Sequence, residues 1–147
     1  MDKTLGDKDI VIRKLKQDDL TGVIELLKSN FNGSFTKNQI SSAWLKYVNQ
    51  NFNHSVIAIC ESKIIGHGSI VISKRLRGGN LGVIEDIIVH SNYRKNNVGK
   101  SIVNYLFDVA KDNGCYKVVL QCEEKNFNFY KKCNFETSGI SMQRFLK

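Results

Sequence analysis

The sequence predicts an α/β protein (an α+β mixed sheet), with a central mixed β-sheet and helices on both faces. Short apolar runs of strand character alternate with amphipathic helical segments in its second half, while the middle is a meander of consecutive strands. The expected order is β-α-α-β-β-β-α-β-α-β, which is not that of a doubly wound parallel sheet. A chain of 147 residues, 41% of them apolar, fits one domain spanning residues 1–147.

The first part of the chain is expected to form one strand and two helices. Residues 10–12 (IVI) are a short apolar strand. Asp18 and Asp19 are expected to cap a helix with apolar residues at positions 20, 23, 24 and 27. A loop containing Gly33 follows over residues 30–35, and residues 36–39 (TKNQ) then have the pattern of a capping box. They predict the start of a second amphipathic helix.

The remaining segments change from the strand period to the helix period and back. A tight turn at residues 61–63 predicts a hairpin, and residues 75–82 form a basic, glycine-rich loop. The expected strands cover residues 55–60, 64–73, 83–90, 116–122 and 138–145. The expected helices cover residues 100–112, ended by Gly114, and 126–133.

The charge distribution favours a small phosphate-bearing ligand. Lys and Arg number 22 against 14 Asp and Glu, a net charge of +8, and half of this excess lies within residues 74–100. The cations there form two clusters on either side of an apolar strand, not the basic and aromatic face expected of a nucleic-acid-binding sheet. We therefore expect an anionic small molecule as partner and no nucleic acid.

Cysteine spacing and hydropathy favour a cytoplasmic protein without a metal. The four cysteines show no Cys-x-x-Cys spacing and do not cluster with the three histidines, so a zinc site is not expected. No apolar run approaches the ~18 residues of a membrane span. Residues 1–8 are charged and lack the apolar region of a secretory signal. We expect reduced thiols and no membrane partner.

One polar turn has the character of an anion site. It follows an apolar strand and opens an amphipathic helix, where free backbone amides and the helix dipole favour negative charge. An ordinary strand–helix loop with surface cations is the alternative, and the spacing of a Walker loop is missing. The residues are Arg94, Lys95, Asn96, Asn97, Val98, Gly99 and Lys100.

This turn and its surroundings resemble the GCN5-related N-acetyltransferase family. The family turn reads Arg/Gln-x-x-Gly-x-Gly/Ala, and Asn97 stands here in place of its first glycine. Asparagine tolerates the left-handed conformation better than most other residues. Further blocks resemble the family members that acetylate glucosamine 6-phosphate. They are residues 84–89 (IEDIIV), 114–117 (GCYK), 124–126 (EKN), 129–135 (FYKKCNF) and 139–143 (GISMQ).

The resemblance implies the acyl-CoA N-acyltransferase fold, acetyl-CoA as co-substrate, no metal, and a homodimer with shared active sites. The implied catalytic residues are Tyr130, Glu85 and Ile88. The implied acetyl-CoA contacts are Ile87, Ile88, Val89, Arg94, Lys95, Asn96, Asn97, Val98, Gly99, Lys100, Gln121, Asn126 and Tyr130. The implied sugar-phosphate contacts are Arg75, Leu76, Arg77, Gly78, Glu85, Asp86, Tyr116, Lys117 and Arg144.

The implied reaction is direct attack of the sugar amine on the thioester, giving N-acetylglucosamine 6-phosphate and CoA for UDP-N-acetylglucosamine synthesis. A backbone amide of Ile88 or Ile87 would stabilise the oxyanion, and Tyr130 would meet the leaving thiolate. The family has an acidic residue where this chain has Gln121, so the expected proton acceptor is Glu85, through water, or a backbone carbonyl beside Gln121. The alternatives are another small-amine acetyltransferase of the same fold and a catalytically weak acyl-CoA-binding domain.

Overall fold

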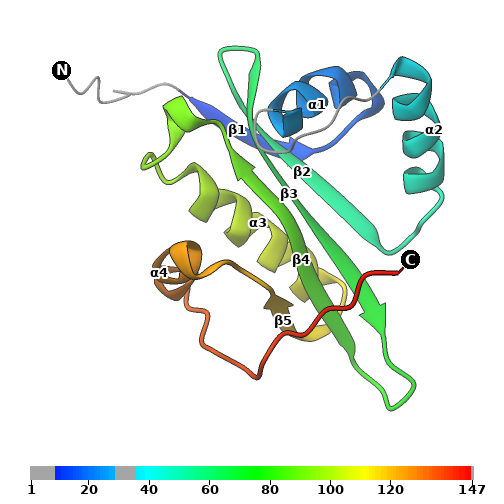
Figure 1. The fold of residues 1–147 in the computed structure, drawn as a ribbon, viewed down its shortest axis with the longest axis vertical. Coiled ribbons are helices and arrows are strands. Elements are labelled where there is room, and N and C mark those ends of the chain that lie inside the picture. Colours follow the sequence, from blue (N-terminus) through cyan, green and yellow to red (C-terminus); the bar gives the residue numbers. More distant parts are fainter. Residues whose placement is uncertain (1–8, 29–35, 147) are drawn as a thin grey trace.

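A computed structural model describes residues 9–28 and 36–146 and shows a mixed sheet between two layers of helix (Figure 1). Its described strands are β1 (Ile10–Lys14), β2 (Asn53–Cys60), β3 (Lys63–Lys74), β4 (Asn80–Val89) and β5 (Cys115–Leu120). They pair in the order β1-β2-β3-β4-β5, antiparallel except for the parallel β4–β5 pair. The expected fold class is thereby confirmed.

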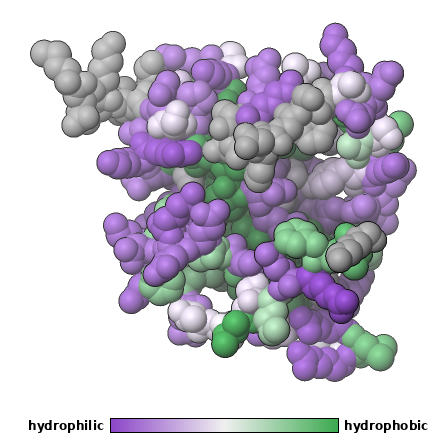
Figure 2. Space-filling model, in the orientation of Figure 1, coloured by the Kyte–Doolittle hydropathy of each residue, from purple (hydrophilic) through white to green (hydrophobic). Residues whose placement is uncertain are grey.

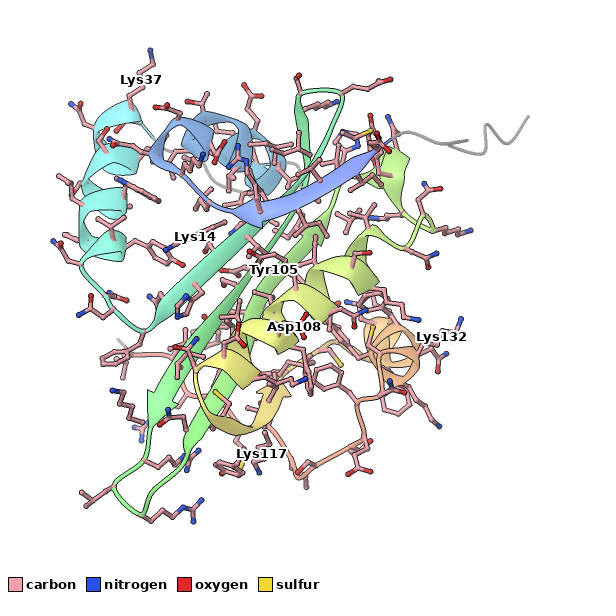
Figure 3. The ribbon with its side chains drawn as sticks, turned by 180° about the vertical axis from the view of Figure 1, so that it is seen from behind. Lys14, Lys37, Tyr105, Asp108, Lys117 and Lys132 are labelled. Carbon is pink, nitrogen blue, oxygen red and sulfur yellow. The ribbon has the colours of Figure 1, made fainter. Side chains whose placement is uncertain are left out.

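The helices are α1 (Leu20–Lys28), α2 (Lys37–Val48), α3 (Val98–Asp112) and α4 (Phe127–Lys132) in the described ranges. Short 3-10 turns occupy Gln17–Asp19, Ser91–Tyr93 and Glu124–Asn126. Helices α1 and α3 lie on opposite faces of the sheet, with α3 facing the viewer in Figure 3. None of the helices in the described ranges is long and apolar enough to cross a membrane.

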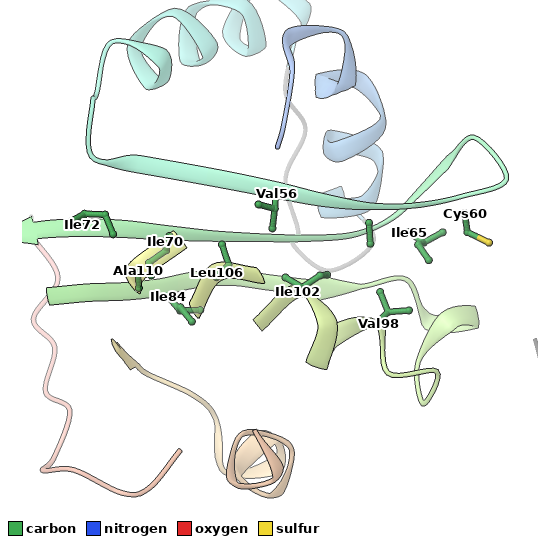
Figure 4. Close-up of a cluster of buried hydrophobic side chains, with 11 residues drawn as sticks. Val56, Cys60, Ile65, Ile70, Ile72, Ile84, Val98, Ile102, Leu106 and Ala110 are labelled. Atoms are coloured by element: carbon green, nitrogen blue, oxygen red, sulfur yellow. The ribbon is translucent and has the colours of Figure 1, made fainter. Parts of the chain in front are cut away.

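The core forms where α3 packs on the sheet. The apolar face of α3 supplies Val98, Ile102, Leu106 and Ala110, which are at most 2% exposed (Figure 4). Glycines on the strands allow this close approach: a Cβ at Gly66 would lie 2.8 Å from Cδ1 of Ile102. The strands contribute Val56, Ala58, Cys60, Ile65, Ile70, Ile72 and Ile84.

The capping residues expected from the sequence are correct for α2 and wrong for α1. Thr36 and Gln39 form the expected capping box, with bonds of 3.2 and 2.9 Å between side chains and backbone amides. Asp19 instead lies in the 3-10 turn before α1. Its carboxylate accepts from the Lys16 amide and forms a two-bond ion pair with Arg13, at 2.7 and 2.9 Å. This pairing lowers the pKa of Asp19.

The expected last strand is wrong. Residues 138–145 are irregular and exposed, and Gly139 has a left-handed φ of 75°. Ile140 and Met142 alternate with polar residues, which is typical of a strand, but none of the strands within residues 9–28 and 36–146 pairs with this segment. The other strands start or end up to three residues from their expected limits. The expectations for residues 1–8 and for the loop over residues 30–35 concern residues outside the described ranges.

The packing of α3 predicts that substitutions at two nearby positions change the free energy of unfolding by very different amounts. Leu106→Ala should lower the free energy of unfolding by about 2–5 kcal/mol, because it removes a fully buried side chain and leaves a cavity. Asp108→Ala is the matched control on the exposed side of the same helix, with an expected change within about 0.5 kcal/mol. Urea unfolding measures both, and equal losses would contradict this packing.

Candidate active site

A cleft opens where β4 and β5 stop pairing. Ile84 and Leu120 are the last paired residues of this parallel ladder, and β5 ends there while β4 continues to Val89. The cleft has a volume of about 250 Å³. Its lining residues are Ile84, Glu85, Asp86, Ile87, Ile88, Leu120, Gln121, Cys122, Glu123, Asn126 and Tyr130. Figure 2 shows apolar surface in the recessed middle of the face seen in Figure 1, bordered by hydrophilic side chains.

The β4 wall of this cleft contains a β-bulge. Ser69 pairs with Glu85 and His67 with Ile88, so β4 carries one residue more than β3 between these pairs. Asp86 has a left-handed φ of 53°, which costs a non-glycine residue on the order of 1–2 kcal/mol. Strict alternation would turn Glu85 and Asp86 to opposite faces, but both line the cleft at the bulge.

Beyond Ile84, the edge of β4 is free for a ligand. In the described part of the chain, residues 85–89 have no partner on β5, whereas their other edge pairs with β3. Backbone N–H and C=O groups on such an edge can bind an extended ligand in the manner of an added strand. This stretch includes Ile87, Ile88 and Val89, whose backbone groups are the expected contacts of acetyl-CoA.

Tyr130 closes the opposite wall of the cleft. Its ring is half-buried and packs edge-on against Phe129 and Phe135, at centroid distances of 4.9 and 6.0 Å. Burial, with smaller contributions from the Cys122 and Cys133 thiols, raises the pKa of Tyr130 to about 12. The hydroxyl is therefore protonated at neutral pH and available as a hydrogen-bond donor.

The turn expected to bind an anion adjoins the same end of β4. Lys95 and Asn97 both have left-handed φ values, 67° and 60°, so Asn97 adopts the conformation expected in place of glycine. Alternating conformations of this kind make a concave set of amides, and the free amides of α3 follow directly. Arg94 Nε donates to the Val89 carbonyl at 3.3 Å. A Cβ at Gly99 would lie 3.0 Å from Phe129, which fixes α3 against α4.

The predicted sugar-phosphate residues divide into two groups. Glu85 and Asp86 line the cleft, whereas Arg75, Leu76, Arg77 and Gly78 form the β3–β4 hairpin, five or more residues away along β4. At about 3.3 Å per residue this separation is on the order of 15 Å. Tyr116 and Lys117 begin β5 beside this hairpin: Tyr116 contacts Gly79, and Lys117 pairs with Leu81. Arg144 lies in the exposed C-terminal segment.

Sequence reasoning missed two polar side chains that contact the bulge. His67 Nδ1 lies 2.9 Å from the Asp86 carbonyl oxygen, and Ser69 Oγ donates to the Glu85 carbonyl at 3.1 Å. Burial lowers the pKa of His67, although the Asp86 carbonyl and carboxylate act in the opposite direction. The signal in the sequence was a histidine between two glycines in an otherwise apolar strand. Cys122 and Glu123 were also missed as lining residues.

Histidine, cysteine and carboxylate side chains do not gather in threes at any point in the described residues where they could hold a metal. The cleft instead offers a free strand edge, a protonated phenol, an amide from Gln121, and three carboxylates, those of Glu85, Asp86 and Glu123. This set suits acyl transfer, in which backbone amides receive an oxyanion and a hydroxyl meets a leaving group.

Comparison with known proteins agrees with this chemistry. The Acetyltransferase (GNAT) family matches residues 20–135. The chain is 36% identical over 149 aligned residues to glucosamine 6-phosphate N-acetyltransferase 1 of Dictyostelium discoideum, covering 97% of this chain and 95% of that protein.

Two solved structures show the same fold. The crystal structure of glucosamine-6-phosphate N-acetyltransferase from Arabidopsis thaliana has a TM-score of 0.87 and 33% identity, covering 95% of this chain and all of that one. An aminoglycoside N-acetyltransferase in complex with CoA has a TM-score of 0.82 at 16% identity, covering 96% and 97% of the two chains. The chain therefore belongs to the acetyltransferase (GNAT) family.

Proposed function

We propose that this protein transfers the acetyl group of acetyl-CoA to the amine of glucosamine 6-phosphate. The observation that carries the proposal is the identity of 36% with a glucosamine 6-phosphate N-acetyltransferase over almost the whole chain. The cleft supports it independently, because it combines an unpaired strand edge with a protonated tyrosine hydroxyl. Residues 1–147 act as a single N-acetyltransferase domain in this proposal.

Acetyl-CoA lies between β4 and β5 in this proposal. The free edge of Ile87, Ile88 and Val89 binds the thioester and the pantetheine arm, with Gln121 and Asn126 on the facing wall. The turn from Arg94 to Lys100 binds the pyrophosphate, because its amides converge and α3 adds its positive dipole end. Arg94 of the turn bonds the Val89 carbonyl, so both parts of the cofactor meet one continuous surface.

The reaction proceeds by direct attack of the amine on the thioester carbonyl. The carbonyl oxygen becomes an oxyanion, which the backbone N–H of Ile88 or Ile87 stabilises. The carbon–sulfur bond then breaks and the CoA thiolate leaves. A phenol with a pKa of about 12 holds its proton far more tightly than an ordinary thiol near 8.5, so Tyr130 donates a hydrogen bond and retains the proton.

The amine must lose a proton, and the side chain of Gln121 cannot accept one. The carboxylates that line the cleft are Glu85, Asp86 and Glu123, and Glu123 forms an ion pair with Lys125 at 3.0 Å. Glu85 accepts the proton through water in this proposal.

The sugar-phosphate site needs a second copy of the chain. The lining of the cleft within one chain includes none of Arg75–Gly78, Tyr116, Lys117 and Arg144. The C-terminal segment carries apolar side chains with no cover in the described structure: Ile140, Met142, Phe145 and Leu146 are 83–96% exposed. A homodimer covers these side chains and brings the cations of one chain to the cleft of the other.

The protein acts in the cytoplasm in this proposal, supplying UDP-N-acetylglucosamine synthesis. Its four cysteines, all in the described part of the chain, are free thiols, as expected in a reducing compartment.

The decisive test is CoA release from acetyl-CoA across a panel of amines. We expect kcat/KM for glucosamine 6-phosphate to exceed that for glucosamine by at least about a hundredfold, because charge-assisted bonds hold the phosphate. Lys117→Ala should raise KM for the sugar phosphate, whereas Lys132→Ala on α4 is the matched control (Figure 3). Equal efficiency with both sugars would indicate another small amine as substrate.

Tyr130→Phe should lower kcat by ten- to a thousandfold, or about 1.4–4 kcal/mol, because the leaving thiolate loses its hydrogen-bond donor. The affinity for acetyl-CoA should stay near normal, since the ring contacts with Phe129 and Phe135 persist. Because the pKa of Tyr130 is about 12, the wild-type rate should not fall between pH 7 and pH 9 through loss of this proton. Unchanged turnover, with chemistry shown to be rate-limiting, would assign Tyr130 to packing.

Mixing two inactive variants tests whether chains share a site. The Tyr130→Phe and Lys117→Ala proteins are mixed so that they form heterodimers. If each site takes Tyr130 from one chain and Lys117 from the other, one site of the heterodimer has both substitutions and the other site has neither. Random exchange should restore about a quarter of wild-type activity, provided each homodimer is nearly inactive. Recovery should not occur if Tyr130 and Lys117 serve the same site from one chain.

A further inference from the structure

Two buried polar side chains of β3 contact the bulge from the sheet face opposite α3. His67 and Ser69 are 6% and 8% exposed. Their neighbours Gly66 and Gly68 contact Ile102 of α3, so alternation along β3 turns His67 and Ser69 to the other face. Among the described residues, the buried polar side chains are His67, Ser69 and Ser55, and none of them has a role in the mechanism above.

Their hydrogen bonds replace the ones that the bulge disrupts. A bulge leaves its extra residue outside the regular ladder, and backbone carbonyls there need other partners. Ser69 Oγ donates to the Glu85 carbonyl at 3.1 Å, and His67 Nδ1 lies 2.9 Å from the Asp86 carbonyl. A carbonyl oxygen only accepts, so Nδ1 carries the proton in this bond.

These two bonds hold consecutive peptide groups at the wall of the cleft. The carbonyls of Glu85 and Asp86 belong to the same peptide units as the amides of Asp86 and Ile87, because each peptide group is planar. Fixing the carbonyls toward β3 therefore fixes the direction of the amides that begin the free edge of β4. Asp86 also has a left-handed φ, a conformation that persists only when the surroundings hold it.

We propose that His67 and Ser69 are positioning residues, which hold the bulge of β4 so that the amide of Ile87 meets the thioester carbonyl. The inference rests on the acetyl transfer proposed above. In this inference, two side chains of the neighbouring strand β3 set the position of the oxyanion donor, although they touch neither substrate. His67 acts as a hydrogen-bond donor whether the ring is neutral or protonated, so it does not exchange a proton with the amine.

The test compares a variant that loses the donor with one that keeps it. His67→Leu removes the bond to the Asp86 carbonyl, whereas the side-chain amide of His67→Asn can place an N–H near the position of Nδ1. Ser69→Ala removes the second bond. Ser55→Ala is the matched control: Ser55 is 5% exposed in the same sheet and bonds the Tyr47 hydroxyl at 2.6 Å instead of the bulge.

At saturating concentrations of both substrates, His67→Leu should lower kcat at least tenfold and Ser69→Ala about three- to tenfold, because a misplaced oxyanion donor acts on the transition state. His67→Asn should retain kcat within about threefold and leave the shape of the pH profile unchanged. KM for acetyl-CoA should change less than threefold in all of them. Ser55→Ala should match the wild type in kcat even where it melts at a lower temperature.

Amide hydrogen exchange of residues 85–88 in the free protein supplies a readout independent of activity. Exchange should accelerate in His67→Leu and Ser69→Ala and return toward wild type in His67→Asn. The wild type could show this exchange pattern and yet acetylate none of the amines. The proposed function would then be wrong, whereas the conclusion that His67 and Ser69 hold the bulge would stand.

Several results would overturn the inference. Wild-type kcat in both Ser69→Ala and His67→Leu would do so, as would losses that only follow melting temperature and include Ser55→Ala. If His67→Asn is as slow as His67→Leu and loses an acidic limb of the pH profile, His67 exchanges protons and is not a positioning residue. Should His67→Leu fail to fold, Ser69→Ala and His67→Asn decide by the same criteria.

Discussion

The site depends on one constraint: β4 is longer than its parallel neighbour β5. Pairing ends at Ile84 and Leu120, and the unpaired edge of β4 beyond that point must find another partner or remain in water. Acetyl-CoA is such a partner in the proposed function. The bulge at Asp86 lies just past the end of the ladder, so a change in strand geometry occurs where the thioester is expected to react.

A single chain encloses one end of this unpaired edge but leaves the other end open. Toward the pyrophosphate turn, Gly99 packs on Phe129 and Arg94 bonds Val89, so the cofactor end is built within a single chain. Toward the β3–β4 hairpin, Leu76 is fully exposed and the C-terminal residues have no cover within the described structure. In the proposed function, one chain therefore builds the part of the site that binds acetyl-CoA but not the part that binds the sugar, which favours a second chain as the missing wall.

The sequence predicted what depends on local pattern and missed what depends on neighbouring strands. The capping box at Thr36 and the left-handed Asn97 follow from local chemistry, and both are present. The strand over residues 138–145 was wrong because alternation records the ability to pair and not the presence of a partner. The bulge has no glycine to signal it, since Asp86 itself adopts the left-handed conformation. His67 could be assigned a contact only once the β3–β4 register was known.

A site without an evident strong base also limits which amine it can acetylate. An amine that titrates near 7.7–8.0, as an α-amino group does, is about one-tenth neutral at pH 7, a cost of about 1.4 kcal/mol. A lysine side chain near 10.4 would need about 4.6 kcal/mol for the same deprotonation. Gln121 supplies no base, and the cleft carboxylates act only if water relays the proton. The chemistry of the cleft therefore favours an amine beside an electron-withdrawing carbon, as in an amino sugar, over a protein lysine.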